Sequence, residues 1–299
     1  MSSPATERLF SLTRPGSVAL IGASPDSTRP ATRVLRGLLR GPDRALFPVN
    51  PRYESVLGVP CVPELAALPG PPDLTVVAVR AEAVLDTVRA AADVGARSFL
   101  VFSSGFAETD SDGARRQVEL RTLADERGLT MIGPNSLGLI DFGERFYCSF
   151  ASILDGGHAL PAGPVALVTQ SGAIGSYVYL MAQARGLGLS HMISTGNEVA
   201  LEASEVGTML LDDPRVGAIA LYTEGVRSGA RMVELCERAG AAGVPVVVLR
   251  GGDSDRGRAA AQSHTGALAG SARVRSELRT SRAAGSRRWS SPPPGVRIS

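Results

Sequence analysis

The chain has 299 residues, enough for two domains of ordinary size, each with its own hydrophobic core. Hydrophobic residues make up 44% of it and the formal net charge is only +2, so no strong field favours nucleic acid or a membrane surface. All 31 basic residues are arginines, and the lack of lysine excludes a Walker-type phosphate loop and a lysine Schiff base.

The cell compartment is predicted from the N-terminus and the cysteines. The first residues contain no apolar core of signal-peptide length, and the longest apolar runs are the size of a strand rather than of a membrane span. Cys61, Cys148 and Cys236 are far apart and odd in number, which argues against a disulfide framework and against a zinc site. We therefore expect a protein of the reducing cytoplasm with no membrane partner.

The first half of the chain alternates short apolar runs with helical patterns. Continuous apolar strands separated by amphipathic helices predict a parallel sheet covered on both faces, which is a doubly wound α/β domain. We assign residues 1–143 to this domain. Strands are expected at residues 18–22, 45–50, 74–79, 98–103 and 130–135, and helices at 31–40, 82–94 and 111–127.

The second half repeats the pattern after a loop-like stretch at residues 143–163. It predicts a second, smaller parallel α/β domain, which we assign to residues 144–270. Strands are expected at residues 165–169, 189–195, 218–224 and 245–250, and helices at 173–185, 202–211 and 228–240. From Ser271 the composition turns to Arg, Ser and Pro, so we expect residues 271–299 to be a disordered or frameshifted tail on a truncated chain.

Ligands of an open parallel sheet bind outside the carboxyl ends of its strands. In the first domain the first of these ends is Gly22-Ala23-Ser24, where glycine permits close approach and the next helix start favours a phosphate. Arg52, after the second strand, is a charge partner for a ligand phosphate. Asn135, after the fifth strand, would line the same crevice.

In the second domain a helix start, a carboxylate and an imidazole converge at one sheet edge. Ser171 and Gly172 open a helix directly after a strand, Glu224 ends a later strand, and His264 follows the last strand. A histidine can carry a phosphoryl group, and a nearby carboxylate orients its ring. No histidine has metal-ligand spacing with a cysteine or a carboxylate, so no metal site is predicted.

The ordered series GAS, VNPRY, SSGFAE, GPNSLG, TQSGAIG, STGN, YTEG and SHTGALAGS resembles the α part of ADP-forming acyl-CoA synthetases over about residues 14–271. These enzymes, also called acetate–CoA ligases, are relatives of the succinyl-CoA synthetase α subunit. The resemblance implies a Rossmann-like CoA-binding domain followed by a flavodoxin-like domain. It also implies a reaction in which acyl-CoA and phosphate give acyl phosphate and CoA, after which a histidine carries the phosphoryl group to ADP.

The resemblance assigns roles to residues that match the family motifs. It makes His264 the phosphate carrier with Glu224 as its support, and it places the phosphoryl group on Ser171 and Gly172. The CoA contacts that it implies are Gly22, Ala23, Ser24, Arg52 and Asn135.

The chain departs from the family at several points. Ser136 stands where cysteine is common and Arg80 where proline is common. The ATP-grasp part is absent, so ADP or ATP and Mg are expected only through a separate ATP-grasp β subunit or domain. The alternative function is that of a non-catalytic CoA-binding module or a truncated paralogue.

Two unrelated enzyme classes fit less well. A nicotinamide-dependent oxidoreductase lacks its glycine pattern here, and Asn-Pro-Arg follows the second strand in place of an acidic residue. A serine hydrolase would need glycine two residues before Ser171, where Thr169 stands.

Overall fold

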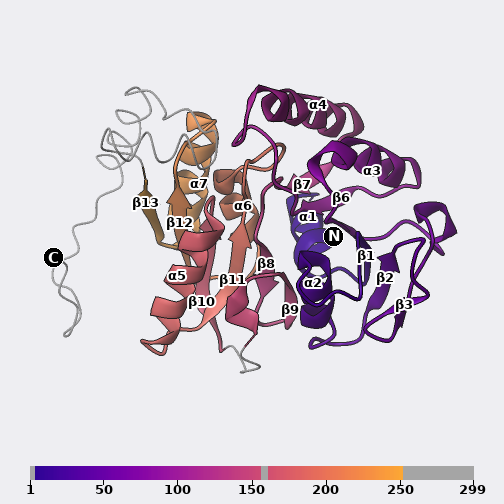
Figure 1. The fold of residues 1–299 in the computed structure, drawn as a ribbon. Coiled ribbons are helices and arrows are strands. Elements are labelled where there is room, and N and C mark those ends of the chain that lie inside the picture. Colours follow the sequence, from indigo (N-terminus) through magenta and orange to yellow (C-terminus); the bar gives the residue numbers. More distant parts are fainter. Residues whose placement is uncertain (1–3, 156–160, 252–299) are drawn as a thin grey trace, which may run out of the picture.

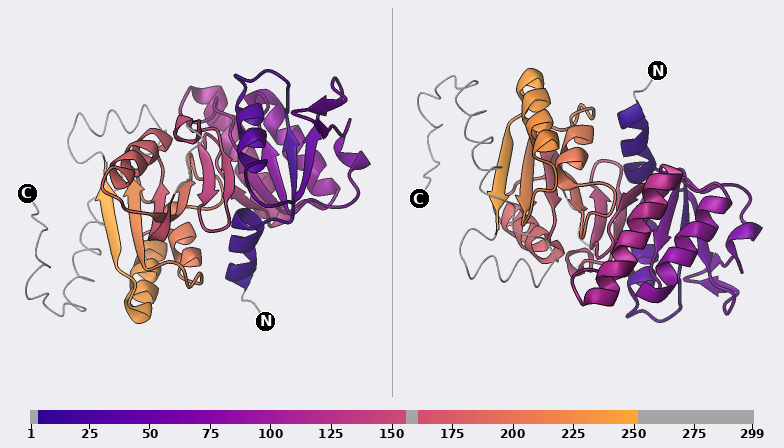
Figure 2. Two further views of the ribbon diagram at one scale, coloured as in Figure 1. Left: turned by 90° about the horizontal axis from the view of Figure 1, so that it is seen from below. Right: turned by 90° about the horizontal axis from the view of Figure 1, so that it is seen from above.

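The computed structural model describes residues 4–155 and 161–251, which form two α/β lobes side by side (Figures 1 and 2). The first lobe is built on a five-stranded sheet with strand order β2-β1-β5-β6-β7. All of its neighbouring strands are parallel. Its strands are β1 (Ser17–Ile21), β2 (Ala45–Val49), β5 (Leu74–Val77), β6 (Ser98–Val101) and β7 (Thr130–Ile132).

Helices cover both faces of this first sheet, as the strand pattern predicted. On one face, α2 (Pro30–Leu38) and α1 (Pro4–Thr13) bury leucines against Leu20 and Leu100. On the other, α3 (Ala81–Asp93) and α4 (Ser111–Arg127) pack on Phe99 and Met131. The doubly wound architecture expected for the first half of the chain is confirmed.

The second sheet has six strands in the order β13-β12-β10-β11-β8-β9. The four parallel strands are β10 (Ala162–Thr169), β11 (Leu189–Ser194), β12 (Ala218–Thr223) and β13 (Val246–Arg250). The helices α5 (Gly172–Gln183), α6 (Ala203–Leu210) and α7 (Gly229–Ala242) connect them. These elements lie where the second α/β series was expected, which confirms a second parallel α/β unit.

Two further strands extend this sheet in a way that the sequence did not reveal. β8 (Gly138–Asp141) pairs antiparallel with β11, and β9 (Phe146–Ser149) pairs antiparallel with β8. The expected boundary at residues 143 and 144 therefore falls inside this hairpin, and the stretch expected to be a loop contains β9 and the start of β10. The hairpin is stabilised by pairing with β11, a tertiary contact that local sequence does not encode.

Other short elements were also missed. The helix α1 lies at the junction of the two lobes, where it packs against both α6 and β6 (Figure 2). A small antiparallel hairpin, β3 (Ser55–Val56) with β4 (Val59–Pro60), follows β2. Among the described residues, no helix has the length and apolar character that crossing a membrane requires.

The helix α2 joins the lobes by packing on β9 of the second sheet. Gly37 makes this contact possible, because a Cβ atom there would lie 2.4 Å from the carbonyl oxygen of Tyr147. Phe146, Leu139 and Val168 belong to the same core cluster as Leu20, so one apolar core runs through both sheets.

Replacing Gly37 with alanine tests this packing. The new methyl group would overlap backbone atoms that cannot rotate away, so Gly37→Ala should lower the free energy of unfolding by about 1–3 kcal/mol. The matched control is Gly240→Ala on the exposed side of α7, where a Cβ meets nothing within 4 Å. There alanine should stabilise the helix by about 0.5–1 kcal/mol. Urea unfolding of both variants measures the two effects, and equal effects would contradict the tight α2–β9 contact.

Candidate active site

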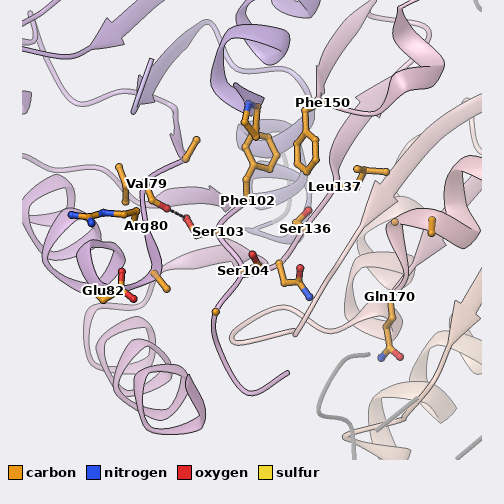
Figure 3. Close-up of a pocket in the computed structure, with 17 residues that line it drawn as sticks. Val79, Arg80, Glu82, Phe102, Ser103, Ser104, Ser136, Leu137, Phe150 and Gln170 are labelled. Atoms are coloured by element: carbon orange, nitrogen blue, oxygen red, sulfur yellow. Dashed lines mark hydrogen bonds between the residues drawn. The ribbon is translucent and has the colours of Figure 1, made fainter. Parts of the chain in front are cut away.

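A cleft of about 740 Å³ lies where the carboxyl ends of the two sheets meet. The first sheet contributes the residues that follow β5, β6 and β7, and the second contributes the start of α5. Figure 3 shows Arg80 and Glu82 on one side of the cleft and Gln170 on the opposite side. The lining residues are Pro30, Ala78, Val79, Arg80, Ala81, Glu82, Phe102, Ser103, Ser104, Gly105, Asn135, Ser136, Leu137, Phe150, Gln170, Gly172 and Ala173.

One wall of the cleft is apolar and comes from both lobes. Phe102 follows β6 and Phe150 follows β9, and their rings meet edge to face with centroids 5.2 Å apart (Figure 3). Leu137 continues this wall toward α5. The unpredicted β8–β9 hairpin thus supplies part of the site.

The cleft also contains serines and Asn135. The Ser103 carbonyl oxygen accepts a 2.8 Å hydrogen bond from the Asn135 amide, and the Ser103 hydroxyl donates to the carbonyl of Val79. Asn135 has φ of +58°, a conformation that asparagine tolerates better than most residues. These bonds hold the ends of β5, β6 and β7 in register at the cleft.

The remaining first-domain residues expected to contact CoA lie at the same sheet edge but do not line this cleft. Gly22 has φ of +91°, and a Cβ there would lie 2.5 Å from the carbonyl oxygen of Ala78, which does line it. Ala23 is buried, and its carbonyl oxygen accepts a 2.6 Å hydrogen bond from the Asn50 side chain. This bond ties the ends of β1 and β2 together.

Ser24 and Arg52 flank that junction. The Ser24 hydroxyl accepts a 3.2 Å hydrogen bond from the amide of Asp26, and its carbonyl oxygen accepts one from the hydroxyl of Thr32. The Arg52 side chain is exposed, while its main-chain amide donates to Asn50 Oδ1 at 3.0 Å. An exposed guanidinium beside two strand ends is suited to bind an anion.

In the second domain, Ser171 and Gly172 form the start of α5. The Ser171 hydroxyl accepts a 3.4 Å hydrogen bond from the amide of Ile174, and the residue is 2% exposed. A Cβ on Gly172 would lie 2.6 Å from Cβ of Leu137, so glycine lets the helix start approach the cleft wall. The partial positive charge of this helix N-terminus faces the cleft, where it favours an anion.

Gln170 connects the cleft to Glu224, a role that sequence reasoning missed. Its Oε1 accepts hydrogen bonds from the amides of Glu224 at 2.6 Å and Gly225 at 3.1 Å. Its Nε2 donates to the carbonyl oxygen of Gly225 at 2.8 Å. The glutamine side chain thus fixes the turn after β12 against the end of β10.

Glu224 itself is 5% exposed. The Tyr222 hydroxyl donates a 3.3 Å hydrogen bond to its Oε1, and burial together with the Glu224 charge raises the pKa of Tyr222 above its ordinary value. His264 lies outside the described residues, so its expected position beside Glu224 stays a prediction.

A second buried carboxyl group, Glu198, lies behind the site and was also missed. It has φ of +57°, and its Oε1 accepts hydrogen bonds from the Thr195 hydroxyl at 2.9 Å and the Ala203 amide at 2.8 Å. Burial raises its pKa to about 7, against the opposing effect of hydrogen bonds from Gln170 and Thr195. The charge of its neighbour Glu202 also contributes to this rise in pKa.

A cluster away from the cleft contains Asp141, His191 and Asp213, whose ligand atoms lie within 4.8 Å of one another. Arg215 already supplies the cation there, because its Nη2 lies 2.7 Å from Asp141 Oδ2 and 2.6 Å from Asp213 Oδ2. Burial alone would raise the pKa of Asp141, but hydrogen bonds from His191 and Arg215 outweigh it and hold the pKa at about 2. Arg14 also pairs with Asp213 at 2.6 Å, so we interpret the cluster as an ion-pair network between the lobes.

Comparison with known proteins agrees with this geometry. Residues 16–141 match the model of a CoA binding domain, and residues 162–290 match that of a succinyl-CoA ligase like flavodoxin domain. The α subunit of acetate–CoA ligase [ADP-forming] II from Pyrococcus furiosus is 32% identical over 260 residues, or 87% of this chain. The chain is a homologue of the ADP-forming acetate–CoA ligases.

Other relatives support this family. A trans-feruloyl-CoA synthase from an unknown prokaryotic organism is 35% identical over 88% of this chain. The dinucleotide-forming acetyl-coenzyme A synthetase 1 of Ca. Korarchaeum cryptofilum, solved with phosphate and ADP, superposes with a TM-score of 0.82 at 29% identity over 92% of this chain. The Rossmann-like and flavodoxin-like folds implied by the resemblance are thus confirmed.

The chain spans only part of these relatives. It covers 55% of the Pyrococcus furiosus subunit, 38% of the trans-feruloyl-CoA synthase and 58% of the Ca. Korarchaeum chain. The match to the flavodoxin domain reaches residue 290, whereas residues 252–299 lie outside the described part of the structure.

The raised pKa of Glu198 predicts a pH dependence of stability. A carboxyl group whose pKa rises from 4.5 to about 7 on folding contributes its full stability below pH 4.5 and loses it as pH rises through 7. Glu198→Gln keeps an oxygen for Thr195 and Ala203, so it should remove this loss, which is on the order of 2–3 kcal/mol.

Urea unfolding between pH 5 and pH 8 measures this slope. Glu126→Gln, on the exposed side of α4, is the control and should leave the pH dependence of the wild type unchanged. A wild type and a Glu198→Gln variant with the same slope would show that Glu198 ionises normally in the folded protein.

Proposed function

We propose that this chain is the α part of an NDP-forming acyl-CoA synthetase. In this proposal it interconverts acyl-CoA plus phosphate with acyl phosphate plus CoA, and passes the phosphoryl group through His264 to ADP on an ATP-grasp partner. The observation that carries the proposal is the position of the α5 N-terminus. It faces, across one cleft, the carboxyl edge of the domain that matches the CoA-binding model.

The first chemical step takes place at the start of α5. A phosphate oxygen attacks the thioester carbonyl carbon, the C–S bond breaks, and CoA leaves as a thiolate that then takes up a proton. The amides of the first helical turn stabilise the phosphate charge, and Ser171 and Gly172 hold that turn against Leu137.

The second step transfers the phosphoryl group to His264. The imidazole attacks the phosphorus of the acyl phosphate, and the carboxylic acid leaves as its anion. Glu224 accepts a hydrogen bond from the other ring nitrogen, orients the imidazole and stabilises the positive charge that develops on the ring as the N–P bond forms. Its burial and the two bonds from its turn to Gln170, a residue of the cleft, support this role.

We assign CoA to the edge of the first sheet, with contacts at Gly22, Ala23, Ser24, Arg52 and Asn135. The close approach of β1 and β5 at Gly22 and the exposed guanidinium of Arg52 support this assignment. Asn135 lines the cleft together with Gly172 and Ala173 at the start of α5.

The partner is an ATP-grasp β subunit or domain, which brings ADP or ATP and Mg. The names of the relatives support it, since the Pyrococcus furiosus protein is called a subunit alpha. We assign the protein to the reducing cytoplasm, in keeping with three cysteines that are all unpaired.

The alternative is a non-catalytic CoA-binding module or a truncated paralogue. The match of residues 16–141 to a CoA binding domain fits this alternative as well, because CoA binding alone needs no phosphate carrier. Such a protein would bind CoA but form no phosphoenzyme, so one labelling experiment separates the two functions.

The phosphohistidine prediction is tested with radioactive phosphate and a panel of acyl-CoAs that includes acetyl-CoA and feruloyl-CoA. Because phosphohistidine is labile in acid, the wild type should gain an acid-labile label and His264→Asn should gain none. The variant should bind CoA as the wild type does, since the imidazole acts only after the thioester is cleaved.

Two other outcomes of the labelling would contradict the proposal. Label on the His264→Asn variant would place the carrier elsewhere in the chain. No label on a folded wild type that binds CoA would favour the non-catalytic module.

The CoA assignment is tested by isothermal titration. Arg52→Ala removes a cation expected to meet a CoA phosphate, so CoA binding should weaken by about tenfold or more, and more strongly at low salt. The control is Arg127→Ala at the end of α4, where the arginine pairs with Asp93 at 2.9 Å. NAD binding comparable to that of CoA would contradict the assignment.

A further inference from the structure

The cleft wall of the first lobe is held by one side chain from the second lobe. Asn197 lies in the turn after β11, is 8% exposed, and does not line the cleft itself. Its main-chain amide donates to the carbonyl oxygen of Pro134 at 2.9 Å, which fixes the turn against the segment that carries Asn135.

The Asn197 side chain makes three hydrogen bonds, all to the first lobe. Its Nδ2 donates to Glu108 Oε2 and, at 2.9 Å, to Gln117 Oε1. Its Oδ1 accepts from Asn135 Nδ2 at 3.2 Å. The opposite amide orientation would set an oxygen against two acceptors, so these partners determine how the amide lies.

Glu108 links Asn197 to a turn that lines the cleft. Its other oxygen, Oε1, accepts hydrogen bonds from the amides of Gly105 at 2.7 Å and Phe106 at 3.2 Å. Arg116 holds the same turn from the other side, donating to the Gly105 carbonyl oxygen from Nε at 3.1 Å and from Nη2 at 2.8 Å. Gly105 has φ of +100° and lines the cleft.

We infer that Asn197 is a positioning residue for CoA binding. It orients Asn135 directly and the Ser104–Gly105 turn through Glu108, so a residue of the second lobe sets the CoA affinity of the first. The inference rests on the proposed function, because it takes Asn135 and the neighbouring strand ends of the first sheet to be part of the CoA site. Asn197 acts through its neighbours and makes no contact with the ligand.

The strongest test exchanges the polarity of one hydrogen bond. Asn197→Asp keeps the oxygen that accepts from Asn135 but sets two carboxylates against each other at Glu108. Glu108→Gln sets two amide donors against each other at the same place. In the double variant, Gln at position 108 donates to Asp at position 197 and still accepts from Gly105 and Phe106.

Isothermal titration with CoA should show each single variant binding about tenfold more weakly, since each loses a hydrogen bond to a charged group. The double variant should recover part of the lost affinity, because it restores the hydrogen bond between positions 197 and 108 but not the one to Gln117. The control is Asp213→Asn, away from the cleft, which breaks the ion pair to Arg14 between the lobes and the one to Arg215 within the second lobe. It should lower the melting temperature and leave CoA affinity unchanged.

The inference is overturned if the wild type binds CoA and Asn197→Asp binds it equally well. It is also overturned if Asp213→Asn loses as much affinity as Asn197→Asp, because the effect is then one of general stability. If Asn197→Asp does not fold, the Glu108→Gln variant carries the same test. A wild type that binds no CoA would instead reject the proposed function.

Discussion

The two lobes depend on a short backbone ladder at their junction. The segment after β11 runs along β7 and the turn that follows it, with hydrogen bonds from Gly133 N to Thr195 O at 3.2 Å, from Val199 N to Gly133 O at 3.0 Å and from Leu201 N to Met131 O at 3.1 Å. A Cβ on Gly196 would lie 2.2 Å from the carbonyl oxygen of Pro134, so only glycine permits this approach. Because of the ladder, the carboxyl ends of both sheets open into one cleft.

This arrangement suits the acyl transfer from CoA that we propose. A Rossmann-like domain presents strand ends and an exposed arginine, while the flavodoxin-like domain presents a helix start that favours an anion. The thioester and the phosphate come from different domains in the proposed function. Rigid contacts between the domains, such as Asn197 with Glu108, then set how closely the two reactants approach.

The buried carboxyl groups fall into two kinds, those with an arginine partner and one without. Asp141 and Asp213 are neutralised by Arg14 and Arg215, and their network connects the segment before β1 to the second lobe. Glu198 has hydrogen-bond donors but no ion pair within residues 4–155 and 161–251, and burial therefore raises its pKa to about 7. Burying a carboxylate without a cation is costly. The two arginines therefore stabilise the charged form of Asp141 and Asp213, whereas Glu198 favours its protonated form.

Sequence by itself determined the alternation of strands and helices, both parallel sheets and the family, because apolar periodicity and ordered motifs are local properties of the chain. It also identified Asn135 and Gly172, which the structure brings into one cleft. Only the tertiary structure decided the place of β8 and β9, because β8 pairs with β11, about 50 residues or more away in the chain, and β9 pairs with β8. The same holds for Gln170, Glu198 and Asn197. Gln170 and Asn197 bond to distant segments, and the burial of Glu198 arises only when the chain folds. Nothing in the local sequence distinguishes these residues from ordinary polar residues after a strand.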